Sequence, residues 1–558
     1  MDIRLPDGRT LTLSAQQFVA AGGEAEVFAW GSEAFKIYSD VQRVPSQDKL
    51  DALAAIQHAN VLVPRVRVMD AQSCEVVGVM MPYLGDAAPL CAYTTASSWA
   101  QHGVVPAQRM GWVASLRKQV VSVHAAGALV VDLSLMNVLV SHSLQEVYLI
   151  DVDSYAVDGF PPTAQSESIR DRTVPRGSVS KETDWFAFAV VAFQVMTGIH
   201  PYRGYHPTLK TLDARMNAQV SVFDASVQVP HVAASFTSIP DQWLDWFRQV
   251  FTSGYREQPP EDSVYVVVPR PVPNLKTSET VKVHLLGEYV SPVLDACMWD
   301  SSLIVRTEEG VFLGQRRVCD GPTGRVAFGL AGPGVPVIAF VEHGLVRCTE
   351  LASGYTHCLS LEATEVASSD SRVYARAGGT LLELQWFRGP KGWWVVPKTV
   401  TQAHPLTARL HHGVLIQRLL GATYASLLTE RGRAIQCRLP QLDGLDVLEA
   451  RYQEGVLFAR VLEAEDVTIW VFRTTNMQAI SGWKSEKVCL NFTVLGARVV
   501  VSEGDMGTLE LFNVSADSSA SRTVDIPGIH ACGPLFDVGQ GVGMIVGSQV
   551  LRLKMLTA

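Results

Sequence analysis

The chain has 558 residues, of which 47% are hydrophobic and 18% charged, and its formal net charge is -9. This composition excludes a disordered chain, and the length favours two or more domains. The negative charge argues against a general nucleic-acid binder, whose surface must attract phosphate groups.

The apolar runs and the cysteines indicate the cellular compartment of the protein. The longest apolar run, residues 185–196, is too short to cross a bilayer. The nine cysteines are scattered, without any C-x-x-C pair, as expected for reduced thiols. We therefore expect a cytoplasmic protein with neither a membrane nor a nucleic acid as its partner.

Near the N-terminus, Gly22 and Gly23 stand in a predicted turn between two short alternating segments. Without side chains at these positions, backbone N–H groups can approach phosphate oxygens. Further along, Lys36 lies between Phe35 and Ile37 in "AFKIY", a predicted strand. A lysine in such an apolar strand needs an anionic partner, and phosphates would serve.

Helical spacing follows these strands, over residues 47–59, 110–127, 183–198 and 240–254. The last three segments start with small or polar residues and carry a glycine near the end. Thr183 and Asp184 open one of them, so Asp184 is expected to cap this helix.

Two polar residues interrupt the apolar stretch "VHAAGALVVDLSLMNVLVS", namely Asp132 and Asn137. Asp151 follows a second apolar run, "VYLI", nineteen residues after Asp132. A hairpin with polar ends would bring the three side chains together. Two carboxylates and an amide oxygen at one place would suit Mg²⁺.

The order of these motifs resembles the protein-kinase superfamily, and in particular a divergent bacterial Ser/Thr kinase-like group. "GGEAEV" is similar to the glycine-rich loop, "AFKIY" to the strand with the phosphate-anchoring lysine, and "GVMMPYL" to the adenine-binding hinge. "HAAGALVVDLSLMN" is similar to the catalytic loop and the helix before it, and "DVD" stands where Asp-Phe-Gly is expected. The resemblance covers residues 1 to about 265.

The resemblance implies an ATP- and Mg²⁺-dependent serine/threonine protein kinase. Asp132 would orient the acceptor hydroxyl and accept its proton, with Lys36 as the second catalytic residue. Asn137 and Asp151 would hold Mg²⁺. The resemblance also implies that Asp184 supports the backbone of the catalytic loop, instead of capping its helix or in addition to it. The residues that would bind ATP are Gly22, Gly23, Val27, Lys36, Met81 and Tyr83.

Several positions depart from the kinase pattern. Ser134 stands where a lysine is expected, and Val130-Val131 replace the usual His-Arg. The segment 154–181 is short for peptide docking, and the helix after Lys36 offers only Asp48 and Asp51 as partners for that lysine. A pseudokinase scaffold, or a kinase-fold transferase acting on a non-peptide substrate, therefore remains an alternative.

The second half of the chain has a different texture. Residues 266–280 have a proline-rich linker composition, and from residue 281 onward short strand-like hairpins recur at intervals of roughly 40 residues. This period is typical of β-propeller blades, and seven blades are favoured over six or over a pair of sandwiches.

The expected fold class is thus an α+β bilobal kinase-like unit followed by an all-β propeller. The kinase-like domain would span residues 1–265, with an N-lobe of about 1–84 and a C-lobe of about 85–265. The propeller would span residues 281–558 and recruit a protein substrate or regulator. Within it, "FRGPKGWWVV" (387–396) is either an exposed aromatic and basic binding patch or, more commonly, a pair of core tryptophans.

Overall fold

The structure is a computed structural model of the chain, and most of the sequence is described by it. The described residues are 1–22, 24–85, 87–95, 98–99, 102–229, 233, 236, 239–261, 281–299, 302–322, 324–389, 392–463, 466–475, 479–485, 491–495, 499–503, 508–514, 519–525, 534–538 and 541–555.

A seven-stranded antiparallel sheet opens the chain, in the order β2-β1-β6-β7-β5-β4-β3. Alternate residues of its strands are apolar, so one face closes over a core that includes Phe18, Phe28 and Phe35. Gly31, at φ +63°, makes the tight turn between β4 and β5. The strands are β1 (Asp2–Arg4), β2 (Thr10–Thr12), β3 (Phe18–Ala21), β4 (Ala25–Trp30), β5 (Glu33–Tyr38), β6 (Val66–Asp70) and β7 (Val76–Pro82).

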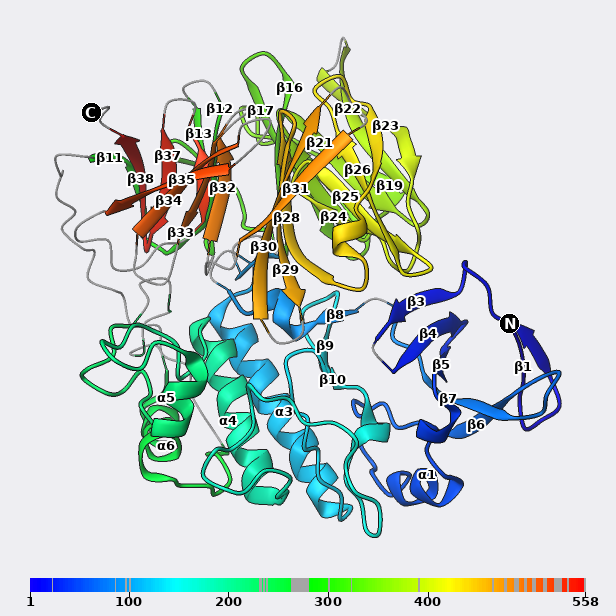
Figure 1. The fold of residues 1–558 in the computed structure, drawn as a ribbon. Helices are drawn as coiled ribbons and strands as arrows, with labels where there is room; N and C mark the ends of the chain where they lie inside the picture. The colour runs from blue at the N-terminus through cyan, green and yellow to red at the C-terminus, as the bar shows by residue number, and fades with distance from the viewer. Residues whose placement is uncertain are drawn as a thin grey trace.

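Helices and a small three-stranded sheet, β10-β9-β8, complete the N-terminal region, which we define as residues 1–261. The helices α3, α4 and α6 lie together away from the first sheet (Figure 1). The helices are α1 (Gln47–Leu53), α3 (Pro106–Ala125), α4 (Lys181–Thr197), α5 (Leu212–Ala218) and α6 (Asp241–Ser253), with short 3-10 turns η1 (Val41–Arg43), η2 (Leu90–Tyr93) and η3 (Val152–Ser154). The strands are β8 (Ala87–Pro89), β9 (Val138–Ser141) and β10 (Val147–Leu149).

The helix α4 is the centre of the core in this part of the chain. Ser180 caps its first turn by accepting a hydrogen bond from the Thr183 N–H, and Gly198 ends it at φ +82°. Phe193, fully buried on α4, meets Phe247 and Phe251 of α6 edge-on. This apolar packing holds α4 in place beneath the loop that follows α3.

Seven four-stranded antiparallel sheets make up the C-terminal sheet region, residues 281–555. The first strand, β11, pairs with the last, β38, in a sheet of order β11-β38-β37-β36, and the other six sheets take their strands consecutively. A 3-10 turn, η5 (Pro440–Leu442), precedes β28. The strands are β11 (Val281–Glu288), β12 (Val293–Trp299), β13 (Ser302–Thr307), β14 (Val311–Leu313), β15 (Arg316–Cys319), β16 (Val326–Gly332), β17 (Val335–Glu342), β18 (Leu345–Glu350), β19 (Thr356–Glu362), β20 (Glu365–Ser369), β21 (Arg372–Ala377), β22 (Thr380–Gly389), β23 (Gly392–Gln402), β24 (Arg409–His411), β25 (Val414–Leu419), β26 (Ala422–Leu428), β27 (Ala434–Arg438), β28 (Asp446–Gln453), β29 (Val456–Glu463), β30 (Asp466–Thr475), β31 (Ala479–Ser485), β32 (Asn491–Leu495), β33 (Val499–Glu503), β34 (Thr508–Val514), β35 (Ser519–Asp525), β36 (Leu535–Asp537), β37 (Val542–Val546) and β38 (Gln549–Met555).

The C-terminal sheet region lies next to the N-terminal region (Figure 1), and polar contacts join the two. His404 Nε2 lies 3.1 Å from the carbonyl oxygen of Ala15, next to the first sheet. Arg409 donates to the carbonyl of Ala87 in β8, and Arg460 to the hydroxyl of Thr95. The two regions are therefore in contact beside the first sheet and along the segment that follows β7.

The expected fold class is wrong. The chain is mostly β, with 45% strand and 17% helix, and the described part holds five α-helices among many small antiparallel sheets. This is not a bilobal α+β kinase fold, and a closed propeller is not found in the described ranges. The reason is that hairpin spacing predicts which strands pair within a sheet, whereas the arrangement of the sheets depends on contacts between them.

Two further expectations concern the predicted linker and the membrane. The predicted linker, residues 266–280, lies outside the described residues, so the domain boundaries stay predictions. Within the ranges that are described, no helix is both long and apolar enough to cross a membrane.

Candidate functional site

The β9–β10 hairpin places two of the predicted metal ligands at one end. Asn137 directly precedes β9, and Asp151 follows β10 by two residues. Val138 pairs with Leu149, and the backbone N–H of Ile150 donates to the Asn137 carbonyl at 3.0 Å. Since antiparallel strands bring their opposite ends together, Asn137 and Asp151 lie side by side.

Lys36 of β5 reaches this hairpin end from the first sheet. Its ammonium group forms an ion pair with the Asp151 carboxylate and a second one, at 2.8 Å, with Asp153. The three residues come from segments 115 and 117 positions apart in the chain. Burial lowers the pKa of Lys36, but the charges of Asp153 and Asp151 outweigh it and raise that pKa above its ordinary value.

The two carboxylates around Lys36 differ in their surroundings. The Asp151 side chain is 32% exposed, whereas that of Asp153 is 6% exposed. Asp153 also accepts a hydrogen bond from the Tyr38 hydroxyl, and its other oxygen, Oδ1, is buried and has no hydrogen-bond partner in the part of the chain that the structure describes. Burial raises the pKa of Asp151, and the like charges of Asp153 and Asp132 add to this, against the effect of Lys36.

Asp132 and Asn137 are in direct contact. Asn137 Nδ2 donates to Asp132 Oδ2 at 2.8 Å, which leaves the amide oxygen of Asn137 as an acceptor or a metal ligand. The second carboxylate oxygen of Asp132 accepts the backbone N–H of Ser166 at 2.8 Å. The Asp132 side chain is thus fixed in place by two donors.

Asp184 supports the backbone just before Asp132. Its carboxylate accepts the N–H groups of Val130 and Val131, each at 2.8 Å, and contacts His124 Nε2 at 2.8 Å. Val131 has a φ of +62°, a strained conformation for a β-branched residue. The expectation that Asp184 caps its helix is wrong, because Ser180 is the N-cap; the alternative, support of a loop, matches these contacts.

The helix α1 does not supply the partner of Lys36. Asp48 and Asp51 are exposed, and Asp51 accepts a hydrogen bond from Gln47 instead. Lys49 of the same helix is buried, and burial lowers its pKa, which the nearby Asp153 charge partly offsets. The reason is distance, because the carboxylates of this short helix lie further from the Lys36 ammonium group than the Asp153 carboxylate does.

Two of the predicted nucleotide-binding residues, Val27 and Met81, lie on the strands next to Lys36. Val27 pairs with Lys36 across β4 and β5, and Met81 pairs with Ala34 across β5 and β7. The N–H of Gly22 donates to the Ala25 carbonyl at 2.8 Å, which closes a turn between β3 and β4, and Gly23 lies outside the described residues.

The hinge segment is bound to the first sheet. The N–H of Tyr83 donates to the Ser32 carbonyl at 2.8 Å. That N–H group is therefore already used within the protein, and the predicted adenine contact at this position would need another donor.

Sequence reasoning did not identify three residues near Lys36 as part of the site, namely Tyr38, Lys49 and Asp153. Tyr38 could have been found from the two-residue period of a strand, because Lys36 and Tyr38 share one face of β5. Asp153 was visible only as a departure from Asp-Phe-Gly. Its contact with Lys36 follows from η3, which turns Asp151 and Asp153 toward the same point.

The side-chain oxygen atoms of Asp151 and Asn137 provide part of a Mg²⁺ site. Asp151 and Asn137 offer hard oxygen ligands at one hairpin end, and Mg²⁺ usually takes one or two carboxylates together with substrate phosphates. The described ranges contain no group of three or more His, Cys, Asp or Glu side chains that could hold a metal alone. A divalent ion here would therefore need ligands from a bound nucleotide or from water.

Comparisons with known proteins add little to this geometry. No protein-family model matches the sequence, and no curated protein matches it. Among solved structures, the chain is similar to a protein kinase, PK-1, of the Cydia pomonella granulovirus, at 11% identity over 42% of this chain and 87% of that chain. The TM-score is 0.32, too low to carry an argument, so the chemistry of the site rests on its own side chains.

Proposed function

We propose that the N-terminal region is an ATP- and Mg²⁺-dependent phosphotransferase that acts on a hydroxyl group of a protein. The observation that supports this function is the meeting of Lys36 with Asp151, beside the Asn137–Asp132 pair. A cation and several hard oxygen donors at one place are the groups that phosphoryl transfer needs.

Each residue has a distinct role in this proposal. Lys36 binds the α- and β-phosphates, and Asn137 and Asp151 hold the metal ion, which would neutralise charge on the phosphates. Asp132 accepts the proton of the acceptor hydroxyl and keeps that hydroxyl aligned for attack. Because Asn137 and Ser166 hold the Asp132 carboxylate, little reorganisation is needed at that group.

Lys36 must give up its ion pair with Asp151 when a nucleotide binds. Asp151 is the more exposed of its two carboxylates, so Asp151 is free to turn to the metal ion while Asp153 retains the lysine. The ion pair with Asp153 thus keeps Lys36 directed at the phosphates.

The test is transfer from labelled ATP by the full chain, with γ-labelled and α-labelled ATP compared in the presence and absence of Mg²⁺. We expect Mg²⁺-dependent transfer of the γ label, and loss of that transfer in Asp151→Asn and Asp132→Asn. Asp213→Asn is the matched control, because Asp213 is an exposed carboxylate on α5. Transfer of the α label instead would indicate a nucleotidyl transferase.

A second candidate function is a nucleotide-binding scaffold without transfer activity. It is favoured by the hydrogen bonds of Asp132, since both of its oxygens already have donors from the protein itself. Mg²⁺ and ATP would then raise the melting temperature of the chain, and Asp151→Asn would remove this shift, while no label is transferred to any acceptor.

A further inference from the structure

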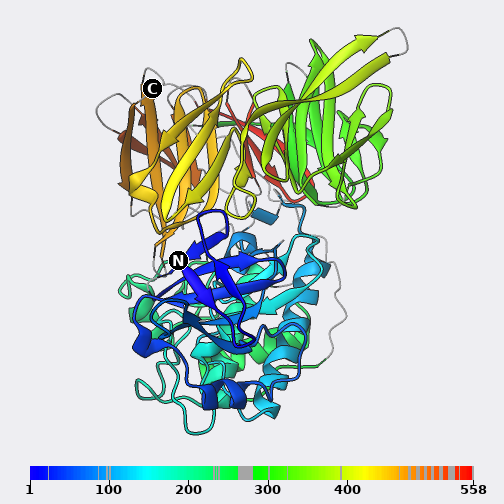
Figure 2. The ribbon, with the colours of Figure 1, turned by 90° about the vertical axis from the view of Figure 1, so that its right-hand side faces the viewer.

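The hairpin of β22 and β23 extends beyond its own sheet. β21 pairs with β22 only from Ala377↔Thr380 to Tyr374↔Glu383, whereas β23 follows β22 as far as Gly389↔Gly392. Among the described residues, residues 384–389 of β22 therefore have a strand partner on one side only. Figure 2 shows this hairpin standing out from the sheet region as the yellow-green pair of strands at the upper right.

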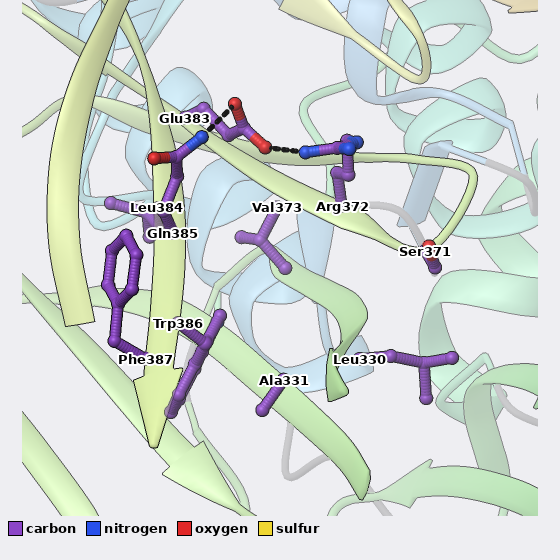
Figure 3. Close-up of a pocket in the computed structure, with 10 residues that line it drawn as sticks. All are labelled: Leu330, Ala331, Ser371, Arg372, Val373, Glu383, Leu384, Gln385, Trp386 and Phe387. Atoms are coloured by element: carbon purple, nitrogen blue, oxygen red, sulfur yellow. Dashed lines mark hydrogen bonds and ion pairs between the residues drawn. The ribbon is translucent and has the colours of Figure 1, made fainter. Parts of the chain in front are cut away.

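A pocket occupies the side of β22 where a partner strand is missing. It has a volume of roughly 330 Å³ and lies between the end of β16, the start of β21 and the extended part of β22 (Figure 3). Ser371 and Arg372, where β21 begins, and Leu330 and Ala331, near the end of β16, line it together with residues 383–387 of β22. The pocket thus continues the line of β21, at the place where one more strand would fit.

Aromatic side chains are exposed on the extended part of the hairpin. Phe387 and Trp394 lie directly opposite each other across the two strands, and they are 52% and 57% exposed. Trp393 instead packs onto Gly332, where a Cβ atom would lie 2.9 Å from its ring. One face of the hairpin is therefore held by β16, and the other face offers an apolar surface.

The charge of this segment is opposite to that of the whole protein. Residues 384–402 contain Arg388, Lys391 and Lys398 but no aspartate or glutamate, in a chain of net charge -9. Arg388 and Lys398 are exposed, and Lys391 lies outside the described residues. A partner at this surface is therefore attracted if it is acidic and repelled if it is basic.

We propose that the β22–β23 hairpin binds an extended acidic segment of a partner protein as an added strand beside residues 384–388. Main-chain hydrogen bonds along the free edge of β22 would give affinity. Alternate apolar side chains of the segment would cover Phe387 and Trp394, and its acidic side chains would face Arg388. The Arg372–Glu383 ion pair forms the polar end of the pocket (Figure 3) and limits how far the segment can enter.

The experiment is selection of peptides from a random displayed library on the full chain, with counter-selection on the Phe387→Ser/Trp394→Ser double variant. We expect the enriched peptides to alternate apolar with acidic residues. In fluorescence anisotropy, their affinity should fall at least about tenfold for the double variant, since exposed aromatic residues dominate such interfaces. Leu420→Ser is the control, because Leu420 is an exposed apolar residue in the turn between β25 and β26, and its loss should leave the affinity unchanged.

Two companion measurements complete the test. Methylation of alternate backbone nitrogens in the best peptide should abolish binding, because an added strand depends on those donors. Far-ultraviolet circular dichroism and the melting temperature of the double variant should match the wild type, since both residues are exposed. Binding is measured without ATP, so its outcome is independent of the phosphotransferase activity.

Three results would overturn the proposal. The first is the absence of any peptide whose binding depends on Phe387 and Trp394. The second is enrichment of basic or neutral sequences. The third is equal or tighter binding, with the same dependence on these two residues, to phosphatidylserine vesicles or to a single-stranded oligonucleotide.

Discussion

Lys36 and Asp153 form an ion pair of 2.8 Å that joins the first sheet to the turn after β10. Both side chains are largely buried, and Tyr38 adds a hydrogen bond to the same carboxylate. Removing one member of a buried pair leaves the other charge without compensation. The pair therefore holds the lysine in one position, whatever Asp151 binds.

The first prediction concerns this pair. Asp153→Asn should lower the proposed transfer rate at saturating ATP by between about ten- and a hundredfold, because Lys36 then depends on Asp151 alone and is less well placed. Steady-state kinetics in the full chain provide the measurement. Tyr38→Phe is the control and should have a smaller effect, since it removes a hydrogen bond and leaves the charge. A wild-type rate in Asp153→Asn would show that Asp151 suffices.

The second prediction concerns Asp184 and the strained backbone that it supports. Asp184→Asn should lower the free energy of unfolding by about 3 kcal/mol, because one carboxylate oxygen that accepts a buried N–H becomes an amide donor. Urea denaturation of wild type and variant measures the difference. Asp213→Asn, on the surface, should change stability by less than about 1 kcal/mol. Equal effects of the two substitutions would contradict the role of Asp184.

The third prediction concerns the aromatic core around α4. Phe193→Ala should cost about 3–5 kcal/mol of stability, because Phe193 is fully buried and contacts four other phenylalanine rings. Thermal denaturation gives the measurement, and Leu420→Ala, at an exposed position, is the control. A loss below about 1 kcal/mol would mean that the cavity collapses or that other residues refill it.

The fourth prediction is a pH dependence in the C-terminal sheet region. Burial acts to raise the pKa of Glu365, but Arg376 and Arg409 outweigh it and lower the pKa from 4.5 to about 2. A carboxyl group with a lowered pKa contributes stability that is complete above 4.5 and is lost as the pH falls toward about 2. Glu365→Gln should therefore cost about 3 kcal/mol at pH 7, from the size of the shift.

Urea denaturation of wild type and Glu365→Gln at a series of pH values provides the check. The difference between the two proteins should shrink as the pH falls below 4.5. A difference that stays constant down to pH 3 would indicate that the loss comes from packing and hydrogen bonding to Leu410, and not from the charge.

Local pattern was sufficient for much of the secondary structure. The strand around Lys36 is β5, as the sequence predicts, and Gly31 at positive φ turns the chain from β4 into it; both depend on neighbouring residues alone. The pairing of β9 with β10 also follows from two short apolar runs with polar ends. The predicted roles of Asp132, Asn137 and Asp151 stay predictions, although the structure brings these residues to one place.

Other features needed contacts that no local pattern contains. The partners of Lys36 are Asp151 and Asp153, not residues of α1, because the turn after β10 brings both carboxylates closer than the helix does. Asp184 supports Val130 and Val131 from 54 and 53 residues away, which helix-capping patterns do not indicate. The exposure of Trp394 beside the half-buried Trp393 depends on β16, which covers only one face of the hairpin.

The sequence by itself determined the hairpins, the helix α4 and the apolar and charged character of each segment, since these depend on neighbours a few residues apart. Only the tertiary structure decided the fold class and which carboxylates surround Lys36. The physical reason is that burial and ion pairing act through space, and their strength depends on which distant segments exclude water from one another.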